Sequence, residues 1–158
     1  MTKEEEVSWC CYFMNIANLV STKSKDKSTK AGAIIIGEGN IILSTGYNGF
    51  IRDMDDTLDE LHERPEKYFW TEHAERNAIY NAARRGIKLL GSTAYTNVHP
   101  CIECARALVQ AGIIEVNIPT KHADLFYRHG RWVDWEESFT NARRIFKAGH
   151  VRVMEHGV

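Results

Sequence analysis

The sequence predicts an α/β fold, a three-layer α-β-α sandwich built on a mixed sheet of about five strands. Short runs rich in Ile, Val and Thr alternate along the chain with longer alanine-rich or amphipathic segments, a pattern typical of layered α/β proteins. The chain has 158 residues, 44% of them apolar, which is enough for a substantial core and fits the size of one domain. We therefore expect a single domain over residues 1–158.

The first half of the chain predicts one helix and two strands. Residues 7–20 carry apolar side chains at helical spacing, and the expected buried stripe is Trp9, Phe13, Ile16 and Val20. Residues 31–36 and 41–47 are apolar runs on either side of a glycine-containing turn, which predicts two joined strands. Because both runs are continuous, we expect a sheet that is covered on both faces.

Two polar connections in this half have more than one interpretation. Residues 21–30 hold four lysines and form either a solvated loop or a phosphate-binding segment. Residues 50–67 are irregular and mainly acidic, and Asp53 and Asp56 are among the carboxylates. This connection is either a solvated surface or a magnesium-assisted nucleotide site.

The second half alternates helices and strands. The alanine-rich segment 73–85 is helical by propensity and is stopped by Gly86, whereas Pro100 opens the helix 101–110 and Gly112 ends it. The remaining expected elements are a strand at 93–96, a strand at 113–118, an irregular stretch at 119–135, a helix at 136–148 and a strand at 151–154.

Composition narrows the class of protein. Twenty basic and twenty-one acidic side chains give a net charge of -1, so we expect no overall cationic field and no stable nucleic-acid binding. No apolar run reaches membrane-spanning length and the first residues are acidic, which predicts a cytosolic protein. In that reducing compartment the pair Cys101 and Cys104 indicates a metal site, whereas Cys10 and Cys11 are expected to be buried apolar residues.

The strongest chemical signal is split between two helix starts. His73 precedes Cys101 by twenty-eight residues, and Cys104 follows three residues later on the same helical face. One imidazole and two thiolates are a ligand set for a zinc ion that keeps its fourth position open for water. Glu75 remains beside that water as a candidate proton carrier, which makes hydrolytic deamination chemically coherent. A structural zinc that only links two helices would use a fourth protein ligand and would not need Glu75.

Several blocks in order resemble the zinc-dependent cytidine deaminase superfamily, whose signature is His-x-Glu followed by Pro-Cys-x-x-Cys. Within it, residues 8–153 are most similar to deoxycytidylate (dCMP) deaminases. The blocks are 24–26 running into 31–36, then 44–49, 73–79, 100–107 and 110–113.

This resemblance implies a cytidine-deaminase-like fold and hydrolysis of dCMP to dUMP and ammonia, which supplies dUMP for thymidylate synthesis. It implies that His73, Cys101 and Cys104 hold one catalytic Zn2+ per chain. Glu75 would shuttle protons while hydroxide attacks C4 of the cytosine ring, and the backbone N–H of Ala74 would hold the ring carbonyl.

The same resemblance implies further contacts. Asn48 would bind the deoxyribose hydroxyl, and Ser24 and Lys25 would meet the 5′-phosphate. Family members are typically homo-oligomers, often hexamers, and many are activated by dCTP and inhibited by dTTP, with Mg2+. Asn48, Gly49, Asp53 and Asp56 are the corresponding effector-site candidates.

Alternatives stay open at this point. The enzyme could act on dCTP or deoxycytidine, could be a polynucleotide deaminase, or could be a non-catalytic zinc module that senses nucleotides. His99 either approaches the pocket or has a structural role. Trp132, Trp135 and Phe139 either line the substrate mouth or pack in the core or a subunit interface.

Overall fold

A mixed five-stranded sheet lies at the centre of the computed structural model, which describes residues 7–120, 127–128, 131–132 and 135–157. The strands are β1 (Gly32–Gly37), β2 (Ile41–Tyr47), β5 (Thr93–Thr96), β6 (Glu115–Pro119) and β9 (Arg152–His156). Their order across the sheet is β2-β1-β5-β6-β9. β1 pairs antiparallel with β2 and β5, whereas β6 pairs parallel with β5 and β9. The prediction of a mixed sheet of about five strands is confirmed.

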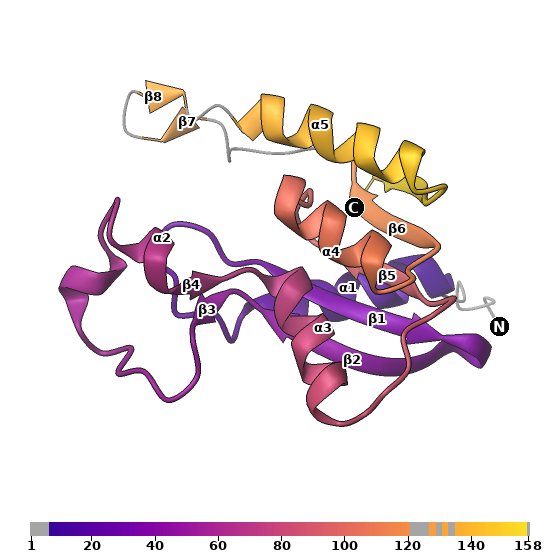
Figure 1. Cartoon of the computed structure of the whole chain (residues 1–158), viewed down its shortest axis with the longest axis horizontal. Helices are drawn as coiled ribbons and strands as arrows, with labels where there is room; N and C mark the ends of the chain where they lie inside the picture. The colour runs from indigo at the N-terminus through magenta and orange to yellow at the C-terminus, as the bar shows by residue number, and fades with distance from the viewer. Residues whose placement is uncertain (1–6, 121–126, 129–130, 133–134, 158) are drawn as a thin grey trace, which may run out of the picture.

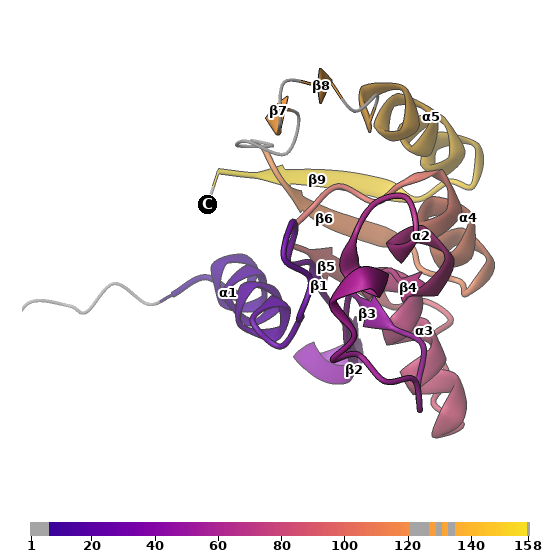
Figure 2. The same ribbon diagram turned by 90° about the vertical axis from the view of Figure 1, so that its left-hand side faces the viewer.

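Helices cover both faces of this sheet. One face carries α1 (Trp9–Ser21), and the other carries α3 (Ala74–Arg84), α4 (Ile102–Gln110) and α5 (Trp135–Ala148) (Figures 1 and 2). This arrangement confirms the predicted three-layer α-β-α sandwich. Because β5, β6 and β9 run parallel, α4 and α5 are their crossover connections, and α4 starts at the carboxyl end of β5.

Two groups of buried apolar side chains hold the layers together. Ile35 of β1 faces the α3 and α4 side, where Ala78, Ala105 and Leu108 are fully buried. Ile34, the neighbouring residue, faces α1 on the opposite side. Successive strand residues point to opposite faces, so the continuous apolar run of β1 serves both cores, as predicted.

Three details differ from the expectations. Helix α1 buries Phe13, Met14, Ala17 and Ser21 rather than a stripe that includes Trp9, whose exposed fraction is 59%. β2 is an edge strand with alternating burial, so it is covered on one face only. Cys11 is exposed, whereas Cys10 is half-buried and packs against the core between α1 and the sheet.

The acidic connection is more ordered than its composition indicates. β3 (Gly49–Phe50) and β4 (Thr71–Glu72) pair antiparallel and bring the two ends of the connection together. Between them lie a 3-10 helix, Asp59–His62, and a short helix, α2 (Lys67–Trp70). Figure 1 shows this segment extending from one end of the sheet, next to the start of α3. The fold-back ends at α2, which is followed by β4 and then by α3.

The remaining elements are short. A second 3-10 turn, Glu38–Asn40, joins β1 to β2. In the stretch expected to be irregular, β6 continues to Pro119, and β7 (Tyr127–Arg128) pairs with β8 (Arg131–Trp132). Over the residues that the structure describes, no helix combines the length and the apolar character needed to cross a membrane.

Candidate active site

The candidate metal ligands come from two helix starts that the fold brings face to face. His73 is the N-cap residue of α3, Cys101 is the N-cap residue of α4, and Cys104 lies in the first turn of α4. Pro100 ends the segment after β5 and favours helix initiation directly after it. The positive ends of both helix dipoles therefore point at the same place, which favours thiolate over thiol.

The distances between these side chains fit a tetrahedral ion. His73 Nδ1 lies 3.4 Å from Cys101 Sγ and 3.5 Å from Cys104 Sγ. With zinc bonds of about 2.3 Å to sulfur and about 2.0 Å to nitrogen, a tetrahedron has an N-to-S edge of about 3.5 Å. Across the described residues, these three form the one His, Cys, Asp or Glu group compact enough to hold a metal, with ligand atoms within 4.8 Å of one another. The donor set and its spacing suit zinc.

The two thiols and the imidazole interact strongly. The hydrogen bond from the Cys104 thiol, together with His73, outweighs burial and lowers the pKa of Cys101 to about 3. The same pairing, together with burial, raises the pKa of Cys104. The hydrogen bond to Cys101 raises the pKa of His73. One member of the thiol pair is thus already a thiolate at neutral pH, and a bound cation favours the second.

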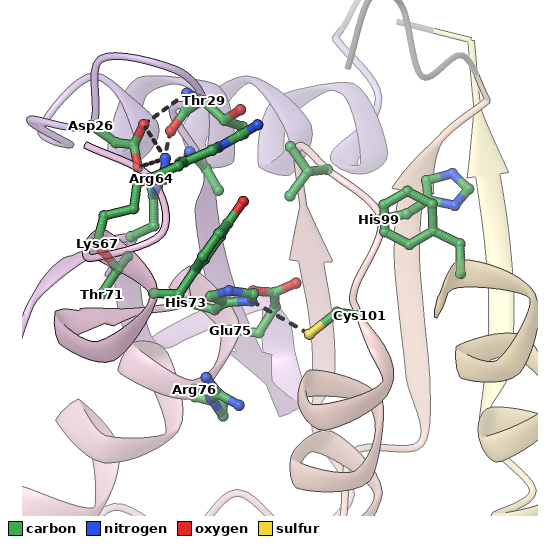
Figure 3. Close-up of a pocket in the computed structure, with 15 residues that line it drawn as sticks. Asp26, Thr29, Arg64, Lys67, Thr71, His73, Glu75, Arg76, His99 and Cys101 are labelled. Atoms are coloured by element: carbon green, nitrogen blue, oxygen red, sulfur yellow. Dashed lines mark hydrogen bonds and ion pairs between the residues drawn. The ribbon is translucent and has the colours of Figure 1, made fainter. Parts of the chain in front are cut away.

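Glu75 is a buried carboxylate beside these ligands. Its exposed fraction is 3%, and Oε2 lies 3.4 Å from Cys104 Sγ. Burial raises the pKa of Glu75, although the nearby His73 partly opposes this effect. Figure 3 shows Glu75 next to His73 and Cys101, with its carboxyl group at the same pocket. A carboxylate with a raised pKa is suited to accept and return a proton near neutral pH.

A pocket of about 180 Å³ opens over this group. Loop 22–31, the connection before β4, the first turn of α3, the segment before α4 and helix α5 all contribute to its wall. The lining residues are Asp26, Thr29, Ala31, Asn48, Arg64, Lys67, Tyr68, Thr71, His73, Glu75, Arg76, Val98, His99, Cys101 and Phe139. Two of the candidate metal ligands, His73 and Cys101, therefore lie at the wall of a cavity, as a catalytic metal requires, and Cys104 is buried behind them.

A family model described as the cytidine and deoxycytidylate deaminase zinc-binding region matches residues 7–120. The chain belongs to the cytidine and deoxycytidylate deaminase family. It is 35% identical over 154 residues to the deoxycytidylate deaminase of Mus musculus, covering 94% of this chain and 80% of the mouse protein. It is 36% identical over 133 residues to a probable deoxycytidylate deaminase of Drosophila melanogaster, covering 77% of this chain and 64% of that protein. An uncharacterized deaminase of Aliivibrio fischeri is 36% identical to this chain over 145 residues, and the match covers 92% of this chain and 91% of that protein.

Solved structures agree with this family. The dCMP deaminase of cyanophage S-TIM5 in complex with dCMP and dUMP aligns with a TM-score of 0.70 and 25% identity. The alignment covers 92% of this chain and 94% of the phage chain. The apo form of the phage enzyme aligns with the same TM-score at 23% identity, which shows the shared fold. The protein is a deaminase of this hydrolase family, with a zinc-binding region that contains His73, Cys101 and Cys104.

Asn48 of this deaminase lies in the pocket wall, held on two sides. Its Oδ1 accepts a hydrogen bond of 2.8 Å from the backbone N–H of Ala31, and its Nδ2 donates one of 2.9 Å to the carbonyl of Thr29. An amide has a second N–H and further acceptor capacity for a ligand. Ala74 is fully buried as the first residue of α3, so its backbone N–H has no acceptor within the helix.

Ser24 and Lys25 are not among the residues that line this pocket. Ser24 is buried, and its hydroxyl donates to the carbonyl of Asn48 at 2.8 Å and accepts from the N–H of Asp26. Lys25 is exposed, and its Nζ lies 2.8 Å from Asp56 Oδ1. Ser24 therefore supports the position of Asn48, while Lys25 points to a different surface.

The effector-site candidates are distributed unevenly. Gly49 and Asp56 line a second hollow of about 100 Å³ together with Lys25. Asn48 belongs to the main pocket, and Asp53 is exposed and lines neither. The two hollows share Asp26 and Thr71 in their walls. The two hollows therefore adjoin each other at these two residues.

His99 and Phe139 form the wall nearest α5. The ring of His99 lies 5.5 Å from the ring of Phe139, and His99 Nε2 is 3.0 Å from the carbonyl oxygen of Pro119. Burial lowers the pKa of His99, so its ring is neutral at pH 7. Both residues line the pocket, whereas the side chains of Trp132 and Trp135 lie outside the described residues.

Sequence reasoning missed most of the polar pocket wall. Arg64 and Lys67 were hidden in a connection whose acidic majority dominated its interpretation, and Thr29 and Asp26 lay in the lysine-rich block. One signal was available. The basic residues of Arg-Pro-Glu-Lys at 64–67 interrupt the acidic run shortly before His73, and no periodic pattern accounts for them.

Proposed function

We propose that this deaminase hydrolyses dCMP to dUMP and ammonia with one zinc ion per chain. One observation carries the proposal: a buried carboxylate, Glu75, adjoins the His-Cys-Cys group at the wall of a pocket. The mouse relative at 35% identity is named a deoxycytidylate deaminase, and the phage enzyme of similar fold was crystallised with dCMP and dUMP. Both support a pyrimidine nucleotide as the substrate.

His73, Cys101 and Cys104 are the residues that would hold zinc. When bound, the ion supplies a Lewis acid that lowers the pKa of a water molecule, although two thiolates weaken this effect and make a nearby base necessary. Glu75 is that base. It accepts a proton from the water and delivers it to a ring nitrogen of the cytosine.

The exchange at C4 of the ring balances in two stages. Oxygen from water forms a bond to C4 while the first proton goes to the ring nitrogen. Glu75 then takes the remaining proton of this hydroxyl and passes it to the amino nitrogen, and the C4–N bond breaks. Ammonia leaves and the ring carbonyl of dUMP remains. Burial raises the pKa of Glu75, so the group accepts a proton more readily than an exposed carboxylate does, which suits its role in this transfer.

The remaining contacts of the base and sugar follow from the pocket wall. We assign the ring carbonyl to the backbone N–H of Ala74 and the deoxyribose hydroxyl to the side-chain amide of Asn48. The amide is pre-oriented by Ala31 and Thr29, so little side-chain entropy is lost on binding. Pre-orientation of this kind favours a defined position for the sugar.

Regulation and assembly belong to the same proposal. The second hollow, with Gly49 and Asp56 in its wall, is the candidate site for dCTP as activator and dTTP as inhibitor. Asp56 is the carboxylate that would meet an accompanying Mg2+, in competition with its ion pair to Lys25. We also propose that the protein forms a homo-oligomer, with a hexamer favoured. Its proposed location is the cytosol.

Ammonia release from a panel of cytosine compounds tests this function. We expect dCMP to be deaminated in preference to dCTP and deoxycytidine, with zinc near one ion per chain on the same sample. A preference for deoxycytidine would contradict the nucleotide assignment. Rates on dCMP that ignore added dCTP and dTTP would remove the effector site while leaving the catalytic proposal intact.

A further inference from the structure

The pocket wall contains three long cationic side chains, and two of them have an acidic partner among the described residues. Arg76 pairs with Glu72 one helical turn before it. Lys67 pairs with Asp26, with Nζ 2.9 Å from Oδ2. Arg64 has no carboxylate within ion-pair distance among the residues that the structure describes. An anion that enters the pocket therefore meets the unneutralised guanidinium of Arg64.

The hydrogen-bond donors of the Lys67 ammonium are all taken up by groups of the protein itself. Its ammonium contacts Asp26 Oδ1 at 3.2 Å, Asp26 Oδ2 at 2.9 Å and Ser28 Oγ at 3.3 Å, so its three N–H groups all have acceptors. The two paired side chains are only 8% and 9% exposed. Burial raises the pKa of Asp26, but the N–H of Thr29 and the Lys67 ammonium outweigh it, and the pKa is lowered. The pair remains ionised, neutral overall, and ties loop 22–31 to α2.

Arg64 is held in place by an aromatic ring rather than by a carboxylate. Its guanidinium carbon lies 5.8 Å from the ring centroid of Tyr68, at cation–π distance. The side chain is exposed, but it forms part of the pocket lining. A guanidinium over an aromatic face keeps its N–H groups available at its edge, where a planar fork can contact two oxygens of a phosphate.

The position of Arg64 relates it to one end of a nucleotide. Figure 3 shows Arg64 beside Thr29 and Asp26, well apart from Cys101 and Glu75. In the proposed function, on which this step rests, C4 of the base reacts at Cys101 and Glu75. The sugar and its 5′ substituent then extend toward the end of the pocket where Arg64 and the Thr29 hydroxyl lie.

We propose that Arg64 binds the 5′-phosphate of the substrate and thereby selects a nucleoside monophosphate over the free nucleoside. The neutral pair of Asp26 and Lys67 next to it leaves Arg64 as the source of net positive charge at that end. Because Arg64 is exposed, its contact with a dianion is partly screened by salt and strengthens specificity by a moderate factor.

This assignment differs from the expectation for Lys25. The Lys25 ammonium lies 2.8 Å from Asp56 and lines the second hollow, not the main pocket. If Arg64 binds the phosphate, the Arg64 variant should lose activity on dCMP selectively. If Lys25 binds it, the Lys25 variant should show that loss instead. Arg85 at the exposed end of α3 offers a matched arginine outside both hollows.

The test compares kcat/KM for dCMP and deoxycytidine in wild type, Arg64→Ala, Arg64→Lys, Lys25→Ala and Arg85→Ala. We expect Arg64→Ala to lower kcat/KM for dCMP about 10- to 100-fold, mainly through KM, as when a charged hydrogen bond is lost. Deoxycytidine should be unaffected, and Arg64→Lys should recover part of the loss. Added salt should reduce the preference for dCMP in wild type more than in Arg64→Ala.

Three outcomes of the kinetics would overturn the assignment. Equal losses for dCMP and deoxycytidine in Arg64→Ala would make its role independent of the phosphate. A selective loss in Lys25→Ala, with Arg64→Ala unchanged, would move the contact to Lys25. A selective loss in Arg85→Ala would show that the effect is one of general charge.

Calorimetric binding of dUMP and deoxyuridine separates this inference from the proposed function. If wild type releases no ammonia from any cytosine compound, the function fails. A binding loss for dUMP alone in Arg64→Ala would still support the phosphate contact. Equal dUMP affinity in both proteins, or no dUMP binding by wild type at millimolar concentration, would overturn it.

Discussion

Glu75 is the residue on which the proposed chemistry depends most directly. It is buried at 3% exposure, and its carboxylate adjoins the Cys104 thiol and lies near His73. A buried carboxylate lowers folding stability unless it is protonated or paired. A buried ionisable group that carries such a cost in a pocket is often functional. Glu75 lies beside the metal ligands but is not one of them. Proton transfer and metal binding can therefore be tested with separate variants.

Glu75→Ala should keep its zinc and lose turnover. Removal of a general acid and base lowers kcat by about 10²- to 10⁴-fold, whereas the three candidate ligands stay in place. Cys104→Ala should lose both zinc and turnover, because only two ligands remain. Ammonia release and zinc per chain, measured on the same samples, distinguish the two variants. Glu38→Ala, an exposed carboxylate in the turn between β1 and β2, is the control.

Near-normal deamination by Glu75→Ala would mean that another group carries the proton, and the mechanism would then be wrong. Loss of zinc in this variant would instead make Glu75 a structural support of the metal group.

At the scale of elements, the site depends on how closely β2 approaches α3. A Cβ at Gly46 would lie 2.3 Å from the carbonyl oxygen of Ala74 and 2.3 Å from the N of Ala78. The neighbours are backbone atoms, so no side chain can move aside. Glycine at this position lets α3 lie directly on the sheet, and α3 carries His73 and Glu75 at its start.

Gly46→Ala should displace the start of α3 and weaken zinc binding. Overpacking of this kind costs about 1–3 kcal/mol of unfolding free energy. Gly32→Ala is the matched comparison, because its Cβ would lie 2.2 Å from the carbonyl oxygen of Ala17 on the α1 side, away from the metal ligands. Chelator competition at a temperature where both variants are folded should show weaker zinc binding only for Gly46→Ala. Equal zinc affinities would show that α3 adjusts without moving its first turn.

The elements also explain which parts of the fold could be predicted. Strands β1, β5 and β6 and helices α3 and α4 have strong local patterns, and the structure confirms them. The stripe of α1 was displaced because the helix begins after Ser8, whose hydroxyl accepts the N–H of Cys11, and packs by Met14 and Ala17. The buried face contains large and small side chains alike, Phe13 with Ala17, so the register of the helix against the sheet rather than residue size leaves Trp9 outside.

At the scale of the whole molecule, charge bears on the class of substrate. A formal charge of -1 gives no general attraction for a polyanion, and two of the three long cations in the pocket wall are neutralised by carboxylates. We expect binding to single-stranded oligonucleotides at moderate salt to be weaker than about 100 µM, the weak limit of non-specific nucleic-acid binding.

Fluorescence anisotropy with a labelled deoxycytidine-rich strand measures this affinity, and a strand without cytosine is the control. Tight binding together with ammonia release from the cytosine strand would contradict the proposed nucleotide substrate and favour a polynucleotide deaminase.

By itself, the sequence determined the chemical groups of the site and the layered fold around them. Cys101 and Cys104 lie one helical turn apart, and His73 and Glu75 share one turn of another helix, so local spacing was enough to predict that they act together. Only the tertiary structure decided which cation faces the pocket. Lys25 and Arg64 both lie in segments without periodicity, and their surroundings are set by distant residues: Asp56 pairs with Lys25, while Asp26 takes Lys67 and leaves Arg64 unpaired among the described residues.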